Sequence, residues 1–401
     1  MRIVITGLGG ICGLGTDAKT IWEGMREGRC GISQLALPYQ DEMTTTHGGA
    51  VTELPDRGLV HRDLVTMDRF AHLGVLAASE ALAQSGLDLT SGENARYGVA
   101  MGTGVFGFQS VEDCFRDRFI NGKQRPPVFS VPRAMPSSPA VQVSLVHKLR
   151  GPVFGITSAC ASSNHALASA MDQLRLGRAD VMVAGGTDAP LVLGSLKGWE
   201  SLRILAKTVC RPFSLGRDGL ALGDGAAVAV IETLDHAKAR GAEILAELVG
   251  AGMSGDANDI VAPTLEGPVS AMRACLKEAE LNASDVDYIN AHGTGTVYND
   301  RMETQAIRTV FGDHADTLSV SSTKSSHAHC LGASGALELI ACVHAIRDNV
   351  VPPTINYLDP DPDCDLDVTP NVARERRVDV AVSNAFAFGG ANAVIAVRRF
   401  V

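Results

Sequence analysis

The sequence has 401 residues, of which 45% are hydrophobic and 20% are charged. This composition supplies a large apolar core and argues against an intrinsically disordered chain. A formal net charge of −10 disfavours nucleic acid as the main partner, because phosphate contacts need a basic face. Apolar runs stay shorter than the roughly 18 to 20 residues of a membrane span, and the N-terminus lacks a signal-peptide layout. We therefore expect a soluble, cytoplasmic protein.

The nine cysteines are scattered, with no pair at Cys-x-x-Cys spacing. The sequence thus suggests neither a zinc cage nor a disulfide framework, and most of these thiols are expected to be buried.

Short β-branched runs alternate with Ala/Leu-rich stretches along the chain. A strand is expected at 2–6, and helices are expected at 71–85, 165–176 and 335–347. This alternation is typical of an α/β protein with layered helices and sheets.

Three features occur twice in the same order, each with an offset somewhat under 200 residues. The pairs are 99–105 with 289–295, 157–163 with 321–326, and 179–186 with 378–382. They predict two similarly folded halves, 1–242 and 243–401, packed as one body, with a new strand starting at 245–249. Chance matching of glycine-rich strings is the alternative.

Cys160 lies in a turn of small residues between an expected strand at 153–156 and an expected helix. At the start of a helix the dipole and the free N–H groups favour thiolate. We interpret Cys160 as an exposed nucleophile on a tight turn, the alternative being a buried structural cysteine.

His292 follows an expected strand at 286–290 and precedes a helix that begins near Asn299. Gly293 and Gly295 allow a ligand to approach the backbone while the imidazole projects into a cavity. A structural histidine at a strand end is the alternative.

The stretch 322–330 supplies Lys324, His327, His329 and Cys330. The last three could bind a metal ion, but their spacing at a helix start does not aim all three at one point. A hydrogen-bonded network with Asp300 and Glu303, which share one helix face, fits better.

A glycine-rich turn at 384–392 contains two aromatic residues, and such a loop can supply a backbone donor to an oxyanion hole. Two other strings resemble binding loops without meeting their requirements. The glycines at 7–13 are misplaced for a dinucleotide, and the acidic run at 359–367 lacks the central Gly and terminal Glu of a calcium loop. We interpret both as structural.

Together these segments resemble the elongating β-ketoacyl-acyl-carrier-protein synthases, type II in particular, from Arg2 to Arg399. The resemblance is carried by Ile-Thr-Gly-Leu-Gly at 5–9, Ser-Ala-Cys-Ala-Ser at 158–162, Val-Ala-Gly-Gly at 183–186, Asn-Ala-His-Gly-Thr-Gly-Thr at 290–296, Ser-Ser-Thr-Lys-Ser at 321–325, Val-Pro-Pro-Thr-Ile-Asn at 351–356 and Phe-Gly-Gly-Ala-Asn at 388–392. Within that family the strings at 158–165, 327–330 and 370–376 look most like the nodulation protein E type, which is associated with specialised acyl chains.

The resemblance implies a thiolase-like α/β fold of duplicated αβαβα halves and a decarboxylative condensation. It implies that Cys160 carries the acyl group, that His292 and His329 polarise the malonyl thioester, and that Lys324, paired with Glu303, orients His329. Backbone donors of Cys160 and Phe388 would form the oxyanion hole, with Phe388 as a gate. Asp300, Thr294 and Thr296 would support the site, and neither a metal nor another cofactor is required.

The resemblance also implies an acyl pocket and partners. Val105, Phe106, Phe108, Gly198, Trp199 and Phe386 would line the pocket, which we expect to suit a flat or bent acyl chain. The acyl and malonyl thioesters would arrive on an acyl carrier protein, received by a basic patch of Arg62, Arg69, Lys123, Arg125 and Arg203. A homodimer through the first-half sheet is expected.

The chain departs from the family pattern at two places. His327 and Ala328 replace Thr-Gly before the second histidine, and Ala387 and Ala391 change the last loop. Three other readings remain: a non-catalytic chain-length factor, which would lack the nucleophile; a thiolase or starter-type enzyme; and a Cys/His metal protein.

Overall fold

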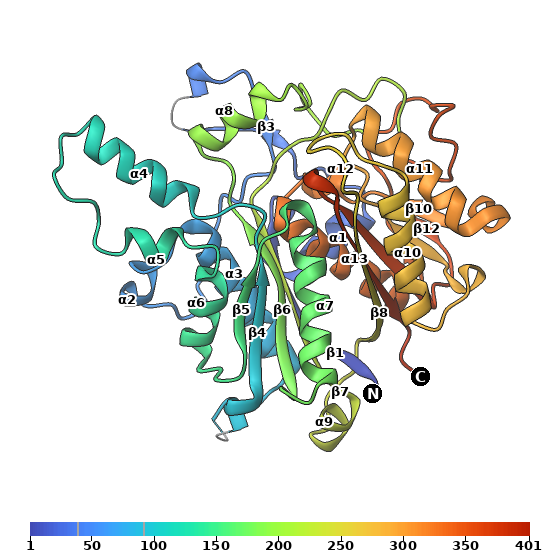
Figure 1. The fold of residues 1–401 in the computed structure, drawn as a ribbon, viewed down its shortest axis with the longest axis horizontal. Coiled ribbons are helices and arrows are strands. Elements are labelled where there is room, and N and C mark those ends of the chain that lie inside the picture. The colour runs from blue at the N-terminus through green and yellow to red at the C-terminus, as the bar shows by residue number, and fades with distance from the viewer. Residues whose placement is uncertain (38–39, 91–92) are drawn as a thin grey trace.

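A mixed ten-stranded sheet runs through the part of the chain that the computed structural model describes, residues 1–37, 40–90 and 93–401 (Figure 1). Its strand order is β10-β9-β13-β14-β8-β1-β7-β6-β4-β5. The strands are β1 (Ile3–Cys12), β4 (Tyr97–Gly102), β5 (Val153–Ile156), β6 (Val181–Asp188), β7 (Gly225–Thr233), β8 (Ala246–Gly255), β9 (Tyr288–Asn290), β10 (Ser319–Ser321), β13 (Val380–Phe386) and β14 (Ala391–Arg398). Two small ladders join β2 (Ser33–Gln34) to β3 (His47–Gly48) and β11 (Val350–Val351) to β12 (Arg374–Glu375).

The sheet consists of two halves with the same connectivity. In the first half β1, β7 and β6 are antiparallel neighbours, and β6, β4 and β5 are parallel. In the second half β8, β14 and β13 are antiparallel, and β13, β9 and β10 are parallel. A short antiparallel contact between β1 and β8, Val4 with Glu247 and Ile5 with Ala246, joins the halves. The predicted duplication is therefore present in the fold.

Helices cover both half-sheets and separate them, which gives the order of layers αβαβα. In the centre, α7 (Ser162–Arg175) packs on β6 and β14, and α13 (Ser334–Asp348) packs on β13 and β7. Outside, α3 (Arg69–Ser85) and α6 (Ser138–His147) cover the first half, while α10 (Glu266–Glu278), packed against α11 (Val297–Phe311), covers the second. The remaining helices are α1 (Ala18–Arg26), α2 (His61–Leu64), α4 (Phe108–Phe119), α5 (Ser130–Ala134), α8 (Leu193–Ser201), α9 (Leu234–Ala239) and α12 (Lys324–His327).

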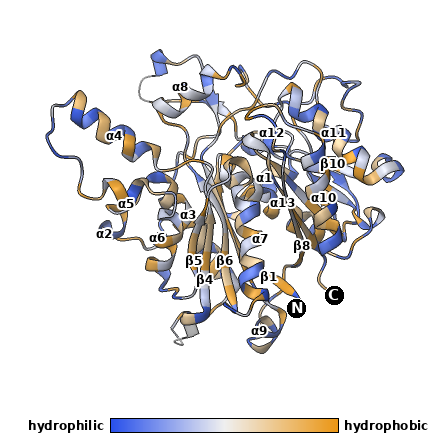
Figure 2. Ribbon diagram, in the orientation of Figure 1, coloured by the Kyte–Doolittle hydropathy of each residue, from blue (hydrophilic) through white to orange (hydrophobic). Residues whose placement is uncertain are grey.

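The layers are held by apolar side chains. Figure 2 shows hydrophobic residues along the inner strands and the helices that face them, with hydrophilic residues concentrated on loops and outer surfaces. Helix α13 illustrates the point, because nearly all of its residues are buried between the half-sheets. In the described residues, every helix is too short or too polar to cross a bilayer.

The glycine string near the N-terminus serves helix packing. A Cβ atom on Gly7 would lie 2.1 Å from the carbonyl oxygen of Ala81, and one on Gly9 would lie 2.0 Å from that of Ala77. Both carbonyls belong to α3, so the glycines let this helix lie directly on β1.

The acidic run at 359–367 is neutralised by arginines. Asp361 pairs with Arg217 and Asp367 with Arg374, while Asp363 pairs with Arg301 at 2.6 Å and Asp365 with Arg308 at 2.7 Å. These carboxylates therefore bind side chains of the protein, as a structural role requires.

Candidate active site

Cys160 lies in the connection from β5 to α7, within the short helical turn η3 (Ala159–Ala161). Ala159 adopts φ 47°, a left-handed conformation that is uncommon for a residue with a side chain, so the turn is sharp. The sequence predicted this turn but also an exposed sulfur, which is wrong, because Cys160 is only 6% exposed. The nucleophile lines a cavity within the protein.

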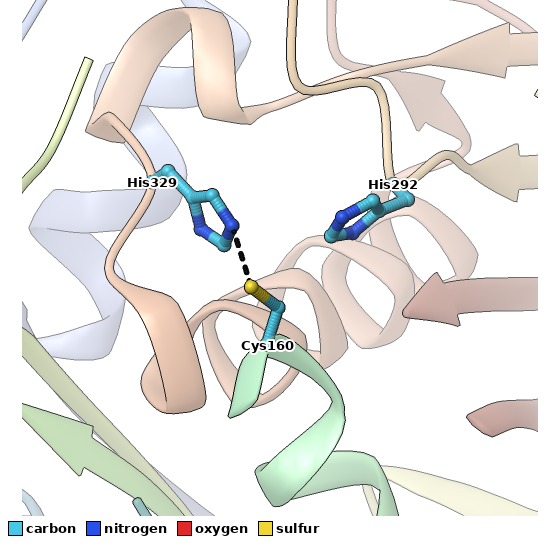
Figure 3. A group of neighbouring side chains, drawn as sticks. All are labelled: Cys160, His292 and His329. Atoms are coloured by element: carbon cyan, nitrogen blue, oxygen red, sulfur yellow. Dashed lines mark hydrogen bonds between the residues drawn. The ribbon is translucent and has the colours of Figure 1, made fainter. Parts of the chain in front are cut away.

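His329 faces the sulfur of Cys160, with its Nε2 3.1 Å from Sγ (Figure 3). On the other side of the ring, the backbone N–H of Leu331 donates to Nδ1 at 3.2 Å, and the hydroxyl of Ser334 lies 2.9 Å from the same atom. Because Nδ1 accepts, the neutral ring carries its hydrogen on Nε2. The structure therefore aims an N–H donor at the sulfur.

His292 completes the group from the loop after β9. Its ring centroid lies 5.5 Å from that of His329, with the planes nearly perpendicular, and both rings project toward Cys160 (Figure 3). The carboxylate of Glu303 fixes the loop by accepting from the backbone N–H groups of His292 at 2.8 Å and Gly293 at 2.7 Å. The three side chains come from separate segments that the two halves bring together.

Burial keeps both imidazoles uncharged. Desolvation lowers the pKa of His292 and of His329 well below the ordinary value, and the positive charge of Lys324 lowers both further. At neutral pH each ring is thus a neutral hydrogen-bond donor. Burial also raises the pKa of Cys160 to about 12, although Lys324 and the backbone N–H of Cys160 itself act in the opposite direction. Burial therefore favours the thiol form of the resting sulfur, while Lys324 and the backbone N–H favour the thiolate.

Lys324 pairs with Glu338, so the expected ion pair with Glu303 is wrong. The ammonium of Lys324 contacts the carboxylate of Glu338, which projects from α13, and both side chains are fully buried. Glu303 instead binds the loop of His292 and the amide of Asn384 at 3.1 Å. Burial raises the pKa of Glu303 to about 7, and these donors partly oppose that change.

Replacing Lys324 by methionine is expected to destabilise the protein strongly. The variant leaves Glu338 buried without its cation, which costs about 3 to 5 kcal/mol of unfolding free energy. The double variant Lys324→Met/Glu338→Leu removes both charges and is expected to recover much of that stability. Urea unfolding of the two variants measures the difference, and equal stability of the single variant and the unmodified protein would contradict it.

Two buried charged side chains, Asp300 and Arg217, hold the loop that carries Thr294 and Thr296. Asp300 accepts from the backbone N–H of Phe213 at 2.8 Å, and the guanidinium of Arg217 lies 3.5 Å from Asp300. Arg217 also donates to the carbonyl of Thr296 at 3.4 Å. The two threonine hydroxyls lie 2.9 Å apart on the cavity wall. The sequence predicted a network of Asp300 with the lysine and histidine of 322–330, but its partners in the structure are Phe213, Gly295 and Arg217. The contribution of Arg217 was not predicted.

Ala328 occupies a conformation that glycine ordinarily adopts. Its φ is 69° and its ψ is 179°, directly before His329. Its methyl group lies where Gly49 and Gly223 leave room, since a Cβ on either glycine would be within 2.9 or 3.0 Å of it. The backbone of His329 is bonded on both sides, from its N–H to Ala221 at 2.7 Å and from Gly223 to its carbonyl at 3.1 Å. The substitution of Ala for Gly is thus accommodated by neighbouring glycines.

Only some of the residues expected in the acyl pocket line the cavity. Trp199 and Phe386 line it together with Cys160 and both histidines. Val105 belongs to the apolar cluster around Cys160. Phe106, Phe108 and Gly198 lie outside the cavity lining, and the two phenylalanines stack on each other with centroids 4.3 Å apart.

Phe388 lies at the exposed side of the same cavity. It is 36% exposed and stacks on Trp199 with centroids 5.8 Å apart. Its neighbour Gly389 has φ 78° and donates its N–H to the carbonyl of Ile260 at 2.8 Å. The final loop therefore places the aromatic side chain of Phe388 at the exposed side of the cavity.

One of the five cations expected on the basic patch has an internal role. Arg69 donates to the buried carboxylate of Asp224 at 2.9 Å and also to the carbonyl of Val51. With a third of its side chain exposed and its guanidinium bound to Asp224, Arg69 is less available to a partner than a free surface cation. Lys123 pairs with Asp117 at 2.9 Å but stays exposed, and Arg62, Arg125 and Arg203 are exposed.

Comparison with known proteins follows the same division of the chain. Residues 1–237 match the model of the β-ketoacyl synthase N-terminal domain, and residues 245–358 match that of the C-terminal domain. Nodulation protein E of Rhizobium sp. (strain N33) is 58% identical over 398 residues, which cover 99% of both chains. The 3-oxoacyl-[acyl-carrier-protein] synthase 2 of Staphylococcus aureus (strain MRSA252) is 38% identical over 408 residues, covering 100% of this chain and 99% of the relative.

Solved structures agree in fold. A β-ketoacyl synthase from Burkholderia phymatum STM815 superposes with a TM-score of 0.93 at 33% identity and covers 100% of both chains. A type II polyketide ketosynthase, bound to a hexaketide and in complex with its acyl-carrier protein, superposes with a TM-score of 0.92 at 30% identity over 100% of this chain and 99% of that one. By sequence over its whole length and by fold, the chain belongs to the β-ketoacyl synthase family.

Proposed function

We propose that the protein is a β-ketoacyl-acyl-carrier-protein synthase, which condenses an acyl thioester with malonyl-acyl carrier protein to give 3-oxoacyl-acyl carrier protein and carbon dioxide. The observation that carries this proposal is the buried sulfur of Cys160 facing two neutral imidazoles, with Nε2 of His329 at 3.1 Å. This group can accept an acyl chain and then stabilise an enolate beside it.

The first step transfers the acyl group to the enzyme. The sulfur of Cys160 attacks the thioester carbonyl, the bond to the carrier's phosphopantetheine sulfur breaks, and the leaving thiolate takes up a proton equivalent to the one that Cys160 releases. The N–H of His329 and the start of α7 stabilise the attacking thiolate. The backbone N–H groups of Cys160 and Phe388 act as donors to the oxyanion.

The second step joins the two units. The Nε2–H of His329 and the ring of His292 donate to the thioester oxygen of the malonyl group, so that negative charge can form there as the bond to the carboxylate breaks. The enolate carbon then attacks the carbonyl on Cys160, the carbon–sulfur bond breaks, and a proton from solvent restores the thiol. The product is two carbons longer than the acyl group that was loaded. The hydrogen-bond donors to both thioester oxygens are groups of the protein itself.

The alternatives are less consistent with the site. A chain-length factor lacks the nucleophile, whereas Cys160 and both histidines are present. The atoms of these three residues lie within 4.8 Å of one another, a spacing that could hold a metal ion. The hydrogen bond from Leu331 to Nδ1 of His329, however, leaves the proton on Nε2, where a metal would need a lone pair. Two histidines with Lys324 also differ from the Cys-His-Asn set of the starter type.

The carrier protein is proposed to dock on exposed cations of the first half. Arg62, Lys123, Arg125 and Arg203 remain exposed and fit an acidic partner. For solved relatives, the ketosynthase captured with its acyl-carrier protein provides a precedent for such a complex.

We also propose a homodimer through the first half of the sheet. Strand β5 forms one edge of the sheet. Helix α6 packs against this edge strand, and its apolar residues Val141 and Leu145 are 42% and 56% exposed. A patch of this kind on a folded protein is typical of an interface. Light scattering of the purified protein gives its mass and hence its oligomeric state.

The acyl pocket is proposed to favour a flat or bent chain, as in specialised acyl synthesis, since nodulation proteins E are 56–58% identical to this chain. Trp199 stacked on Phe388 supplies a flat wall.

Trp199→Ala is expected to reduce the preference for polyunsaturated over saturated acyl groups of equal length by about tenfold, because it removes aromatic contact area. Competition between the two acyl-carrier substrates, followed by mass spectrometry, measures the ratio. Equal use of saturated medium and long acyl chains by the unmodified protein would contradict a pocket that favours a flat or bent chain.

The function itself is tested with purified protein. Incubation with acyl-carrier protein loaded with acyl or malonyl groups should yield 3-oxoacyl carrier protein, and mass spectrometry of the peptide that contains Cys160 should show the trapped acyl group. Absence of both from correctly folded protein, over a panel of chain lengths and carriers, would refute the proposal.

A further inference from the structure

Asp188 is a buried carboxylate that the steps above do not use. It is the last residue of β6 and is fully buried. Its Oδ2 accepts from the backbone N–H groups of Gly104 at 2.7 Å and Gly332 at 2.6 Å, and its Oδ1 accepts from the hydroxyl of Thr103 at 2.6 Å. Burial raises its pKa to about 6, and these neutral donors oppose the change. A buried charge held in this way is costly unless its oxygens are bonded.

The first segment that Asp188 holds lies against the turn of Cys160. The carbonyl of Thr103 accepts from the hydroxyl of Ser162 at 3.0 Å, at the start of α7. A Cβ atom on Gly104 would lie only 3.0 Å from the carbonyl oxygen of Ala159. Thr103 and Gly104 thus contact residues that precede and follow Cys160 in the chain.

The second segment lies just after His329. Gly332 belongs to the helical turn η6 (Leu331–Ala333), whose first residue donates its N–H to Nδ1 of His329. A Cβ on Gly332 would lie 2.2 Å from the nitrogen of Gly104, so the two backbones touch. Leu331 itself has φ 46°, and this strained conformation needs surrounding bonds to hold it. One oxygen of Asp188 bonds to both segments.

We propose that Asp188 is a positioning residue for the condensation. By joining the segment that packs on Cys160 to the segment that follows His329, it sets the distance between the sulfur and Nε2 and keeps the N–H of Leu331 on the opposite ring nitrogen. This inference rests on the proposed function. It extends that function to a group that touches neither substrate nor reacting atoms.

Three variants separate the hydrogen bonds from the charge. Asp188→Ala removes every acceptor and should lower kcat for condensation by about 100-fold, the cost of a misplacement of about 1 Å, with less effect on KM. Asp188→Asn should stay within about fivefold of the unmodified rate, because its amide oxygen can accept from Gly104 and Gly332 while its NH₂ faces the rotatable hydroxyl of Thr103. It loses only the long bond, 3.4 Å, from the N–H of Val105. Thr103→Val, the matched control, keeps the backbone bonds from Gly104, Gly332 and Val105 and should also stay within about fivefold.

A second measurement needs no substrate. Nitrogen-15 NMR of protein labelled at histidine, with His329→Gln for assignment, should show one tautomer of His329 protonated at Nε2 in the unmodified protein and in Asp188→Asn. Asp188→Ala should show a mixture, because the N–H of Leu331 is no longer held on Nδ1. If the unmodified protein fails to condense, the proposed function fails, but this spectrum still tests the positioning.

The outcomes are distinct. Folded Asp188→Ala with an unchanged rate and a single tautomer would overturn the proposal. Asp188→Asn keeps the shape of the side chain and decides the matter even where Asp188→Ala does not fold: a loss of more than about tenfold would show that the charge, not the bonding pattern, is required.

Discussion

Replacing Cys160 by alanine should abolish condensation, with a fall of about 10⁵-fold or more, because no other group can carry the acyl chain. Decarboxylation of malonyl-acyl carrier protein should persist. Both histidines keep their backbone anchors in this variant, since Leu331 bonds His329 and Glu303 bonds the loop of His292 independently of the sulfur. Mass spectrometry of the acyl-carrier pool separates the two products, acetyl from 3-oxoacyl.

The control for this variant is another buried thiol. Cys275→Ala, in α10 and outside the cavity, makes the same chemical change and should leave condensation nearly unaltered. Condensation by Cys160→Ala at a rate near that of Cys275→Ala would remove Cys160 from the mechanism.

Replacing His292 by alanine should lower both condensation and malonyl decarboxylation, each by about 100- to 1,000-fold, because a donor to the developing enolate oxygen is lost. Acylation of Cys160 should be affected much less, since the N–H that faces the sulfur belongs to His329. The three activities can be measured on one preparation: acyl transfer by intact-protein mass, decarboxylation by acetyl-carrier formation, and condensation by 3-oxoacyl product.

The matched control is His344→Ala. His344 is partly buried and stacks on Trp22 with ring centroids 5.5 Å apart, and it lies outside the cavity lining. If decarboxylation survived in His292→Ala at the level of this control, the polarising role would belong to His329 alone, and our assignment of His292 would be wrong.

The sequence predicted the fold, and it predicted that the candidate reacting groups lie in turns after strands, because both features are encoded by local patterns. The strand expected at 153–156 is β5 (Val153–Ile156), and the helix expected at 335–347 is α13 (Ser334–Asp348). Small residues directly after a strand mark a turn at a sheet edge, and Cys160 and His292 both stand in such turns. The repeated order of these segments predicted that the two halves would bring them together.

The groups that support the site could not be predicted in the same way, because their partners are far apart in sequence. Lys324 was assigned to Glu303, yet α13 brings Glu338 closer. Arg69 was expected to be a free surface cation, whereas the buried carboxylate of Asp224 binds it. The role of Asp188 was not predicted, since most of its partners are backbone N–H groups, which any residue can supply, and its one side-chain partner, Thr103, is 85 residues away in the sequence.

The division of the reacting groups between the halves has a consequence for the order of assembly. The nucleophile is made in the first part of the chain to leave the ribosome, while both imidazoles belong to the second, more than 130 residues later. While the first half is being synthesised, Cys160 has neither histidine beside it. The reaction can begin only after the second half has folded against the first. Condensation therefore requires that both halves have folded. An acyl group transferred to Cys160 of an incomplete chain could not be condensed.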